Sequence, residues 1–293
     1  MFLRAKKALI ISTSALLLLG ACSSPEATTK KKERKVDQNR VVTDDQKVTF
    51  KLVNRAHLST KQLENVKKKL HEGYNFIRHF TDTGYTPPAN IMVMLNPNSN
   101  NPSFGGKNFI RLENADRDTY ELIHEMTHTL LGYDDDKGYM TQEGLATYME
   151  NQYGDLKLSV DQFVRYFIKM RGRVPLSRLT DEKVASSYFR PLLDAPENVT
   201  LRQISYVEAG SFATYLLNFY GREKFTRVYN QSPLNEKLKE VYGKDVAQLE
   251  NEWLAEVAKT PELTEEEAAQ YPFLQNIPSS LQKLDPELFA KDR

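Results

Sequence analysis

The spacing of hydrophobic residues predicts that the N-terminal part of the chain combines strands with one helix. Apolar and polar residues alternate over 48–53, as in a strand, whereas the apolar residues of 60–80 recur every three or four positions, as on one face of a helix. Short apolar runs at 91–95 and 109–112 flank a loop rich in Asn, Pro and Gly, and they predict two further strands. This part of the chain is therefore expected to be α+β.

From about residue 116 onward, helical spacing dominates. We predict helices over 118–131, 140–153, 159–171, 180–189, 200–220, 222–230 and 245–258. The first has a suitable N-cap in Asp118, with Glu121 three residues later, and a suitable stop in Gly132. The sole tryptophan, Trp253, lies on the apolar face of the last helix and is expected in the core. The predicted fold class is α+β: a small mixed sheet with a helix in the N-terminal half, then a mostly helical C-terminal half.

The first 22 residues have a layout of their own. Residues 1–21 contain basic side chains, then an apolar run over 8–19, then two small residues, which is typical of a secretory signal peptide. The run is too short to span a bilayer comfortably. The only cysteine, Cys22, follows directly, and this junction resembles a bacterial lipobox. The resemblance implies cleavage before Cys22, lipidation of that residue and stable extracytoplasmic anchoring to a bacterial membrane.

Two stretches lack the pattern of a folded domain. Residues 22–47 are mostly polar and are interpreted as the lipidated cysteine followed by a solvated tether. Residues 259–293 are acidic at their start and interrupted by prolines, and they indicate no function. One domain is therefore predicted over 48–258, divided into an α+β part (48–115) and a helical part (116–258).

The composition narrows the functional classes. Of 293 residues, 40% are hydrophobic and 27% are charged, which is the balance of a globular protein. A formal net charge of +1 supplies no global attraction to nucleic acid, so no nucleic-acid partner is expected. No run of about 20 apolar residues follows the signal region, and the helical half lacks the strand-helix alternation of a two-lobed solute-binding protein. The oligomeric state stays open.

His124, Glu125 and His128 form an HExxH sequence. In a chain of this composition, the expected number of accidental HExxH matches is on the order of 0.005. On a helix, the two histidines project from one face and can share a metal ion. Glu125 is rotated by about 100° around that helix. There it can accept a proton from a metal-activated water, as the general base of a zinc hydrolase does.

A catalytic zinc ion needs a third protein ligand, and two residues are candidates. Glu143 lies on the next predicted helix, which a short loop can bring back beside the histidines. Asp134 lies six residues after His128, as in the metzincin motif, but this chain has Leu131 where that motif has its glycine. We favour Glu143 and keep Asp134 as the alternative.

The segments HEMTH (124–128), EGLATY (143–148) and YVEAGSFATYL (206–216) follow the order seen in gluzincin metallopeptidases, and 48–258 resembles their peptidase MA-like group. The resemblance implies a thermolysin-like core with a zinc cleft between the two halves. It implies that Zn²⁺ is bound by three residues, His124, His128 and Glu143.

The same resemblance implies roles around the metal. Glu125 would act on the water, and the strand at 108–112 would pair with an extended peptide substrate. Gluzincins commonly add a His or Tyr that stabilises the oxyanion, and no histidine remains after His128, so Tyr206 is the candidate.

Two functions are compatible with these features. The first is a membrane-anchored, extracytoplasmic zinc metallopeptidase that hydrolyses peptide bonds of a peptide or protein substrate. The second is a non-catalytic surface lipoprotein that keeps a structural zinc site and binds a peptide or protein partner. The presence of Glu125 favours the first, because a purely structural zinc site has no use for a general base.

Overall fold

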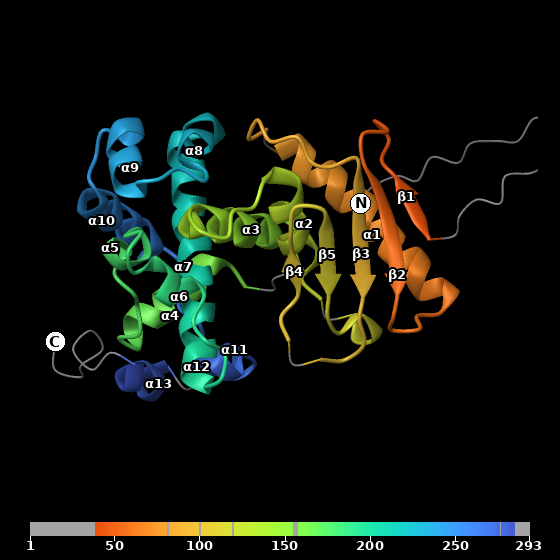
Figure 1. Cartoon of the computed structure of the whole chain (residues 1–293). Coiled ribbons are helices and arrows are strands. Elements are labelled where there is room, and N and C mark those ends of the chain that lie inside the picture. Colours follow the sequence, from red (N-terminus) through yellow and green to blue (C-terminus); the bar gives the residue numbers. More distant parts are fainter. Residues whose placement is uncertain are drawn as a thin grey trace, which may run out of the picture. The chain divides into compact units, whose positions relative to one another are not determined.

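The computed structural model describes residues 39–284, apart from 81, 100, 119, 155–157 and 276. Within these residues, five strands form one mixed sheet in the N-terminal half (Figure 1). They are β1 (Arg40–Val42), β2 (Thr49–Asn54), β3 (Asn90–Leu95), β4 (Phe104–Gly105) and β5 (Phe109–Leu112), in the spatial order β1-β2-β3-β5-β4. The three central strands are parallel and both edge strands are antiparallel.

Helix α1 (Thr60–Phe80) connects the parallel strands β2 and β3 and runs across one face of the sheet (Figure 1). Its buried face includes Leu70, Tyr74 and Ile77, and the Tyr74 ring meets Phe50 of β2 edge to face with centroids 6.2 Å apart. A crossover of this length is what two parallel neighbours require. The predicted helix and strands of this half are confirmed.

The remainder is helical. After the short 3-10 helix η1 (Ala115–Arg117) come α2 (Leu122–Leu131), α3 (Tyr139–Tyr153), α4 (Val160–Lys169), α5 (Leu176–Leu179), α6 (Ala185–Phe189), α7 (Pro196–Tyr220), α8 (Arg222–Val228), α9 (Leu234–Tyr242) and α10 (Val246–Val257). Helix α2 contacts β4 and β5 on one side and α3 on the other. The predicted α+β class is therefore confirmed in its coarse form.

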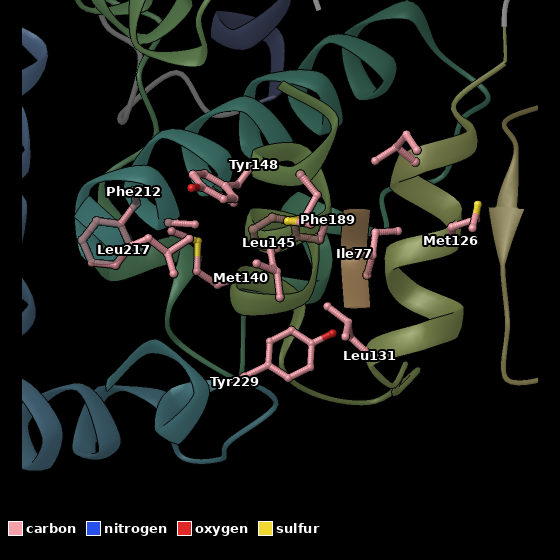
Figure 2. Close-up of a cluster of buried hydrophobic side chains, with 14 of the residues drawn as sticks. Ile77, Met126, Leu131, Met140, Leu145, Tyr148, Phe189, Phe212, Leu217 and Tyr229 are labelled. Carbon is pink, nitrogen blue, oxygen red and sulfur yellow. The ribbon is translucent and has the colours of Figure 1, made fainter. Parts of the chain in front are cut away.

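The core of the helical part lies around α3 and α7. Figure 2 shows buried side chains from α1, α2, α3 and α7, among them Ile77, Met126, Leu145 and Phe212, each at most 3% exposed. Trp253 of α10 is fully buried, as predicted, and its Nε1 donates to Ser211 Oγ at 2.9 Å.

The predicted start of the HExxH helix is wrong. Helix α2 begins at Leu122, and the N-cap position is occupied by Glu121, whose side chain makes no capping bond. Asp118 has left-handed backbone dihedrals and pairs with Lys69 of α1 at 2.9 Å. Asp118 therefore forms a tertiary ion pair instead of capping α2, and the local sequence pattern does not reveal that pair. The predicted stop is confirmed, because Gly132 has φ 98° and donates its N–H to His128 O.

Other boundaries differ from prediction for local reasons. The segment 180–189 is not one helix, because Thr180 Oγ1 donates back to Leu176 O and Asp181 Oδ1 accepts from Lys183 N, which makes a turn between α5 and α6. Helix α9 was not predicted, and it begins after Pro233 rather than after a polar cap.

The flanking regions are also more ordered than their composition indicates. The predicted tether extends too far, because Arg40–Val42 pairs with β2 as an edge strand and Thr43 is buried. The C-terminal stretch contains α11 (Glu265–Ala269), α12 (Pro272–Gln275) and α13 (Ile277–Leu284). The predicted signal peptide and the predicted lipidation site Cys22 lie outside the described residues. In the described part of the chain, no helix is both long and apolar enough to cross a membrane.

Candidate metal centre

Helix α2 presents both histidines of the HExxH sequence on one face. His124 and His128 are one turn apart, and their ring centroids are 4.9 Å from each other. Every residue of α2 is buried, since the helix lies between the sheet and α3. The two imidazoles are therefore held in an interior site rather than on the surface.

Helix α3 brings Glu143 to these two rings. Glu143 Oε2 lies 3.0 Å from His124 Nε2 and 3.3 Å from His128 Nε2, and its side chain is only 1% exposed. One ligand atom from each of the three residues lies within 4.8 Å of the others. Two imidazole nitrogens and one carboxylate oxygen converging in this way form a group that could hold a metal ion.

Asp134 does not belong to this group. Its backbone N–H donates to Gln142 Oε1 and its carbonyl accepts from Gln142 Nε2, while its carboxylate accepts from Asp136 N. The loop that follows α2 is thereby tied to the start of α3. Among the described residues, the structure places Glu143, and not Asp134, beside the histidines.

Arg190, which follows α6, holds the second oxygen of the Glu143 carboxylate. Its Nη2 donates to Glu143 Oε1 at 2.6 Å, its Nη1 donates to Tyr206 Oη at 2.6 Å, and Nη2 also lies 3.2 Å from Tyr133 Oη. Burial alone would raise the pKa of Glu143, but the positive charges of His128 and Arg190 hold that pKa well below its usual range. Glu143 is therefore ionised, with Oε2 directed to the histidines.

Glu150 lies two turns after Glu143 on α3 and faces the outer nitrogen of His124. Its Oε2 is 3.5 Å from His124 Nδ1. Metal-binding histidines usually give their second nitrogen to such an acceptor, which fixes the tautomer and the ring orientation. His128 Nδ1, by contrast, is buried with no hydrogen-bond partner among the described residues.

Glu125 faces the same cavity from the neighbouring position on α2. Burial raises the pKa of Glu125 to about 8, although the nearby His124 acts in the opposite direction. The N–H of Gly105 in β4 donates to this carboxylate. A side chain at residue 105 would collide with the Glu125 carbonyl, so a glycine is needed where the edge strand passes α2.

These groups line a cavity of about 360 Å³, which we call the central cavity. Its walls come from β4, α2, α3, α4, α7 and the C-terminal segment. The strand beside it is β4 (Phe104–Gly105) and not 108–112 as predicted, because β5 is paired on both sides, with β3 and with β4. The two-residue strand was too short to be found from alternation.

Tyr206 lies at the site, as expected from its place in α7. Its ring stacks on His124 with centroids 5.7 Å apart and planes 4° apart, and its hydroxyl accepts from Arg190. Burial raises the pKa of Tyr206 well above 10, so the hydroxyl keeps its proton. Since Arg190 donates to the oxygen, that proton is free to bond an acceptor in the cavity.

Sequence reasoning missed Arg190, Glu150 and Tyr133. Glu150 had a usable signal, because it lies seven residues after Glu143 and thus on the same helix face. Arg190 had none, since it follows a five-residue helix and is 47 residues from the carboxylate that it binds.

Comparison with known proteins adds no identity. No protein-family model matches the chain, and no curated protein matches it.

Proposed function

We propose that the protein is a zinc-dependent metallopeptidase of the gluzincin type. The observation that carries the proposal is the buried convergence of His124, His128 and Glu143 beside Glu125, all facing the central cavity. Two imidazoles and one carboxylate are the ligand set of catalytic zinc in such enzymes, with an open position for water. When bound, the ion supplies a Lewis acid that acidifies water and polarises a peptide carbonyl.

The chain's own side chains supply the remaining steps. In its ionised form, which the positive charge of a bound ion would favour, the Glu125 carboxylate takes a proton from the attacking water and delivers it to the leaving amine nitrogen. The Tyr206 hydroxyl, held by Arg190, donates to the carbonyl oxygen as negative charge develops on it. The edge of β4 that faces away from β5 pairs with no other described strand, and its backbone would receive an extended peptide lying across the cavity as an added strand.

Three features favour a thermolysin-like core. The HExxH helix lies directly against an antiparallel edge strand, the glutamate comes from the following helix, and a third helix, α7, closes the site behind them. We propose that the zinc cleft lies where the sheet-containing part meets the helical part. The sequence and the arrangement of these helices support the same assignment.

Two variants test the function. Zinc content is measured for the purified chain 23–293 and for Glu143→Ala, and hydrolysis of a peptide library is measured for wild type and Glu125→Gln. We expect about one zinc per wild-type chain, much less zinc in Glu143→Ala, and retained zinc with no hydrolysis in Glu125→Gln. Equal hydrolysis by wild type and Glu125→Gln would contradict the role of Glu125.

The outcomes also separate the alternative. A protein that binds zinc but hydrolyses no peptide, and in which Glu125→Gln changes nothing, would be the non-catalytic lipoprotein with a structural zinc site. Normal zinc in Glu143→Ala with loss of zinc in Asp134→Ala would transfer the third ligand to Asp134.

We propose an extracytoplasmic location, with the protein anchored through lipid on Cys22. The signal-like residues 1–21 and the lipobox-like junction support this. We expect the full chain to partition with membranes and Cys22→Ser to appear in the soluble fraction after a salt wash. A Cys22→Ser protein that stays with the membrane would contradict the anchor.

A further inference from the structure

The C-terminal segment 265–284 is held firmly against the helical part of the domain. Helices α12 and α13 pack on α7 (Figure 1), and Leu274, Ile277 and Leu281 are fully buried. Gly172 has no room for a Cβ, because the atom would collide with Ile277 Cγ2. The guanidinium of Arg165 donates to Ala258 O and Thr260 O just before the segment. The segment is therefore a fixed part of the domain and not a loose tail.

Two aromatic side chains of this segment reach the central cavity. Tyr271 and Phe273 line it together with Phe163 of α4. The Phe163 ring is 4.9 Å from the Tyr271 ring, nearly perpendicular to it, and 6.1 Å from the Phe273 ring. We call these three residues the aromatic wall. Phe163 is buried, whereas the other two are half-buried.

The aromatic wall and the metal centre belong to one cavity but differ in chemistry. The metal side carries His124, Glu125 and Glu143, while the aromatic wall carries three rings, and Val207 of α7 adds another apolar side chain to the cavity lining. Arg202 and Gln203 also line the cavity, and the Arg202 guanidinium lies over the Tyr206 ring, 5.9 Å from its centroid. An apolar wall beside a small number of converging polar groups is the usual composition of a ligand site.

The segment does not fill the cavity that it lines. About 360 Å³ remains with α11, α12 and α13 in place, which is within the usual range of ligand pockets, about 300–1,000 Å³. A segment that blocked the site would leave no such space. The observed volume favours a wall that contacts the substrate.

We propose that the aromatic wall is the subsite for a large apolar side chain of the substrate, aromatic or long aliphatic, adjacent to the peptide bond that is cleaved. This inference rests on the proposed peptidase function. It assigns the C-terminal segment a role in selecting the substrate, with Tyr271 and Phe273 as specificity-determining residues. Replacing alanine by phenylalanine at the matching substrate position should tighten binding by about 10-fold or more, because the ring leaves water and packs on the wall.

Binding is tested without turnover, in the zinc-loaded full chain carrying Glu125→Gln. The probes are labelled hexapeptides of Gly and Ser that carry one Phe, Ala or Glu at successive positions, and fluorescence anisotropy gives each dissociation constant. We expect one position at which the Phe peptide binds about 10-fold more tightly than the Ala peptide, with the Glu peptide no better than Ala.

Variants locate the preference. In the same background, Tyr271→Ala and Phe273→Ala should reduce the Phe-to-Ala ratio to about 3-fold or less and leave the zinc content unchanged. Phe219→Ala is the matched control, because Phe219 is 58% exposed and does not line the cavity. Phe273→Trp serves as a second variant if the alanine variants do not fold, because it keeps an aromatic ring in the wall. The larger indole should narrow the subsite and shift the binding preference from the Phe peptide toward the Ala peptide.

Several results would overturn the subsite. The first is tighter binding of the Glu peptides than of the Ala peptides, which would point to Arg202 as the recognition group. The second is a Phe-to-Ala binding ratio that neither Phe273→Ala nor Phe273→Trp changes. The third is that no peptide binds. Failure of the subsite is distinguishable from failure of the peptidase function. A wall-dependent Phe preference in a protein whose wild type hydrolyses nothing would leave the subsite standing, and hydrolysis without that preference would remove the subsite alone.

Discussion

Arg190 donates to three side chains of the candidate site, Glu143, Tyr206 and Tyr133. The planar guanidinium has donors in a rigid arrangement, so it sets the relative orientation of the groups that it contacts. By occupying Glu143 Oε1 it leaves Oε2 as the oxygen that faces both histidines. One oxygen of the Glu143 carboxylate is thus directed to the group of side chains that could hold a metal ion.

Glu150 should act on the metal through His124. Glu150→Ala removes the carboxylate 3.5 Å from Nδ1, and we expect about a 10-fold loss of zinc affinity, because the ring loses the partner that orients it. Glu150→Gln keeps an acceptor and should lose less. Competition with a chromophoric chelator measures the affinity, with Glu256→Ala at an exposed ion pair as the control. Unchanged affinity in Glu150→Ala would show that Glu150 does not orient His124.

At the scale of elements, the site depends on how closely α3 and α7 approach. A Cβ at Gly144 would lie 2.7 Å from the Ala209 carbonyl oxygen, and a Cβ at Gly210 would lie 2.6 Å from Thr147 Cγ2. Each helix therefore has a glycine where the other one passes. Because Gly144 directly follows Glu143, any displacement at this crossing also moves the proposed metal ligand.

Gly144→Ala should destabilise the protein although alanine is the better helix former. The intrinsic helix gain is about 1 kcal/mol, whereas overpacking against a backbone carbonyl costs about 1–3 kcal/mol. We expect a lower free energy of unfolding in urea and weaker zinc binding. Gly73→Ala is the matched comparison, since its nearest neighbour at 2.7 Å is the movable Ile123 Cδ1. A Gly144→Ala protein more stable than Gly73→Ala would contradict the tight crossing.

At the scale of the whole molecule, the central cavity is assembled from segments far apart in the sequence. Its lining residues range along the chain from Pro102, just before β4, to Phe273 of α12. The sheet supplies the edge, and α2 and α3 supply the proposed ligands. Helix α4 and the C-terminal segment supply aromatic rings, and α7 supplies both polar and apolar side chains. Loss of any one packing layer is therefore expected to change the site as well as the stability.

The buried Glu208 of α7 should make global stability depend on pH. Burial raises the pKa of Glu208 well above its ordinary 4.5, although Arg173 acts in the opposite direction. Its Oε1 accepts from Val174 N at 3.0 Å, and its Oε2 has no partner among the described residues. The folded state thus binds this proton more tightly than the unfolded state, and the contribution to stability falls as pH rises from 4.5 through the folded pKa.

Glu208→Gln removes this titration and keeps the acceptor for Val174 N. The free energy of unfolding of the variant, relative to wild type, should therefore be greater at pH 8 than at pH 5. Urea denaturation at both values measures it, and the difference between the two proteins cancels the other titrating groups. A difference independent of pH would mean that Glu208 is not buried in the folded protein as described.

How much the sequence predicts depends on the range of the interaction. The i and i+4 spacing of His124 and His128 predicts two rings on one face, because a helix fixes that geometry locally. Helix α1 and strands β2, β3 and β5 were likewise predicted from periodicity. The predicted helix cap at Asp118 was wrong, since the Asp118 carboxylate pairs with Lys69, 49 residues away in the sequence.

The sequence by itself therefore determined the α+β class, the HExxH helix and the choice of Glu143 as the favoured third ligand. Only the tertiary structure decided that Arg190 holds Glu143, that β4 is the edge beside the cavity, and that Tyr271 and Phe273 line it. These contacts join segments that no local periodicity relates. They follow from the close packing of the helices and the sheet, because the position of each element depends on the side chains of all the elements that it contacts.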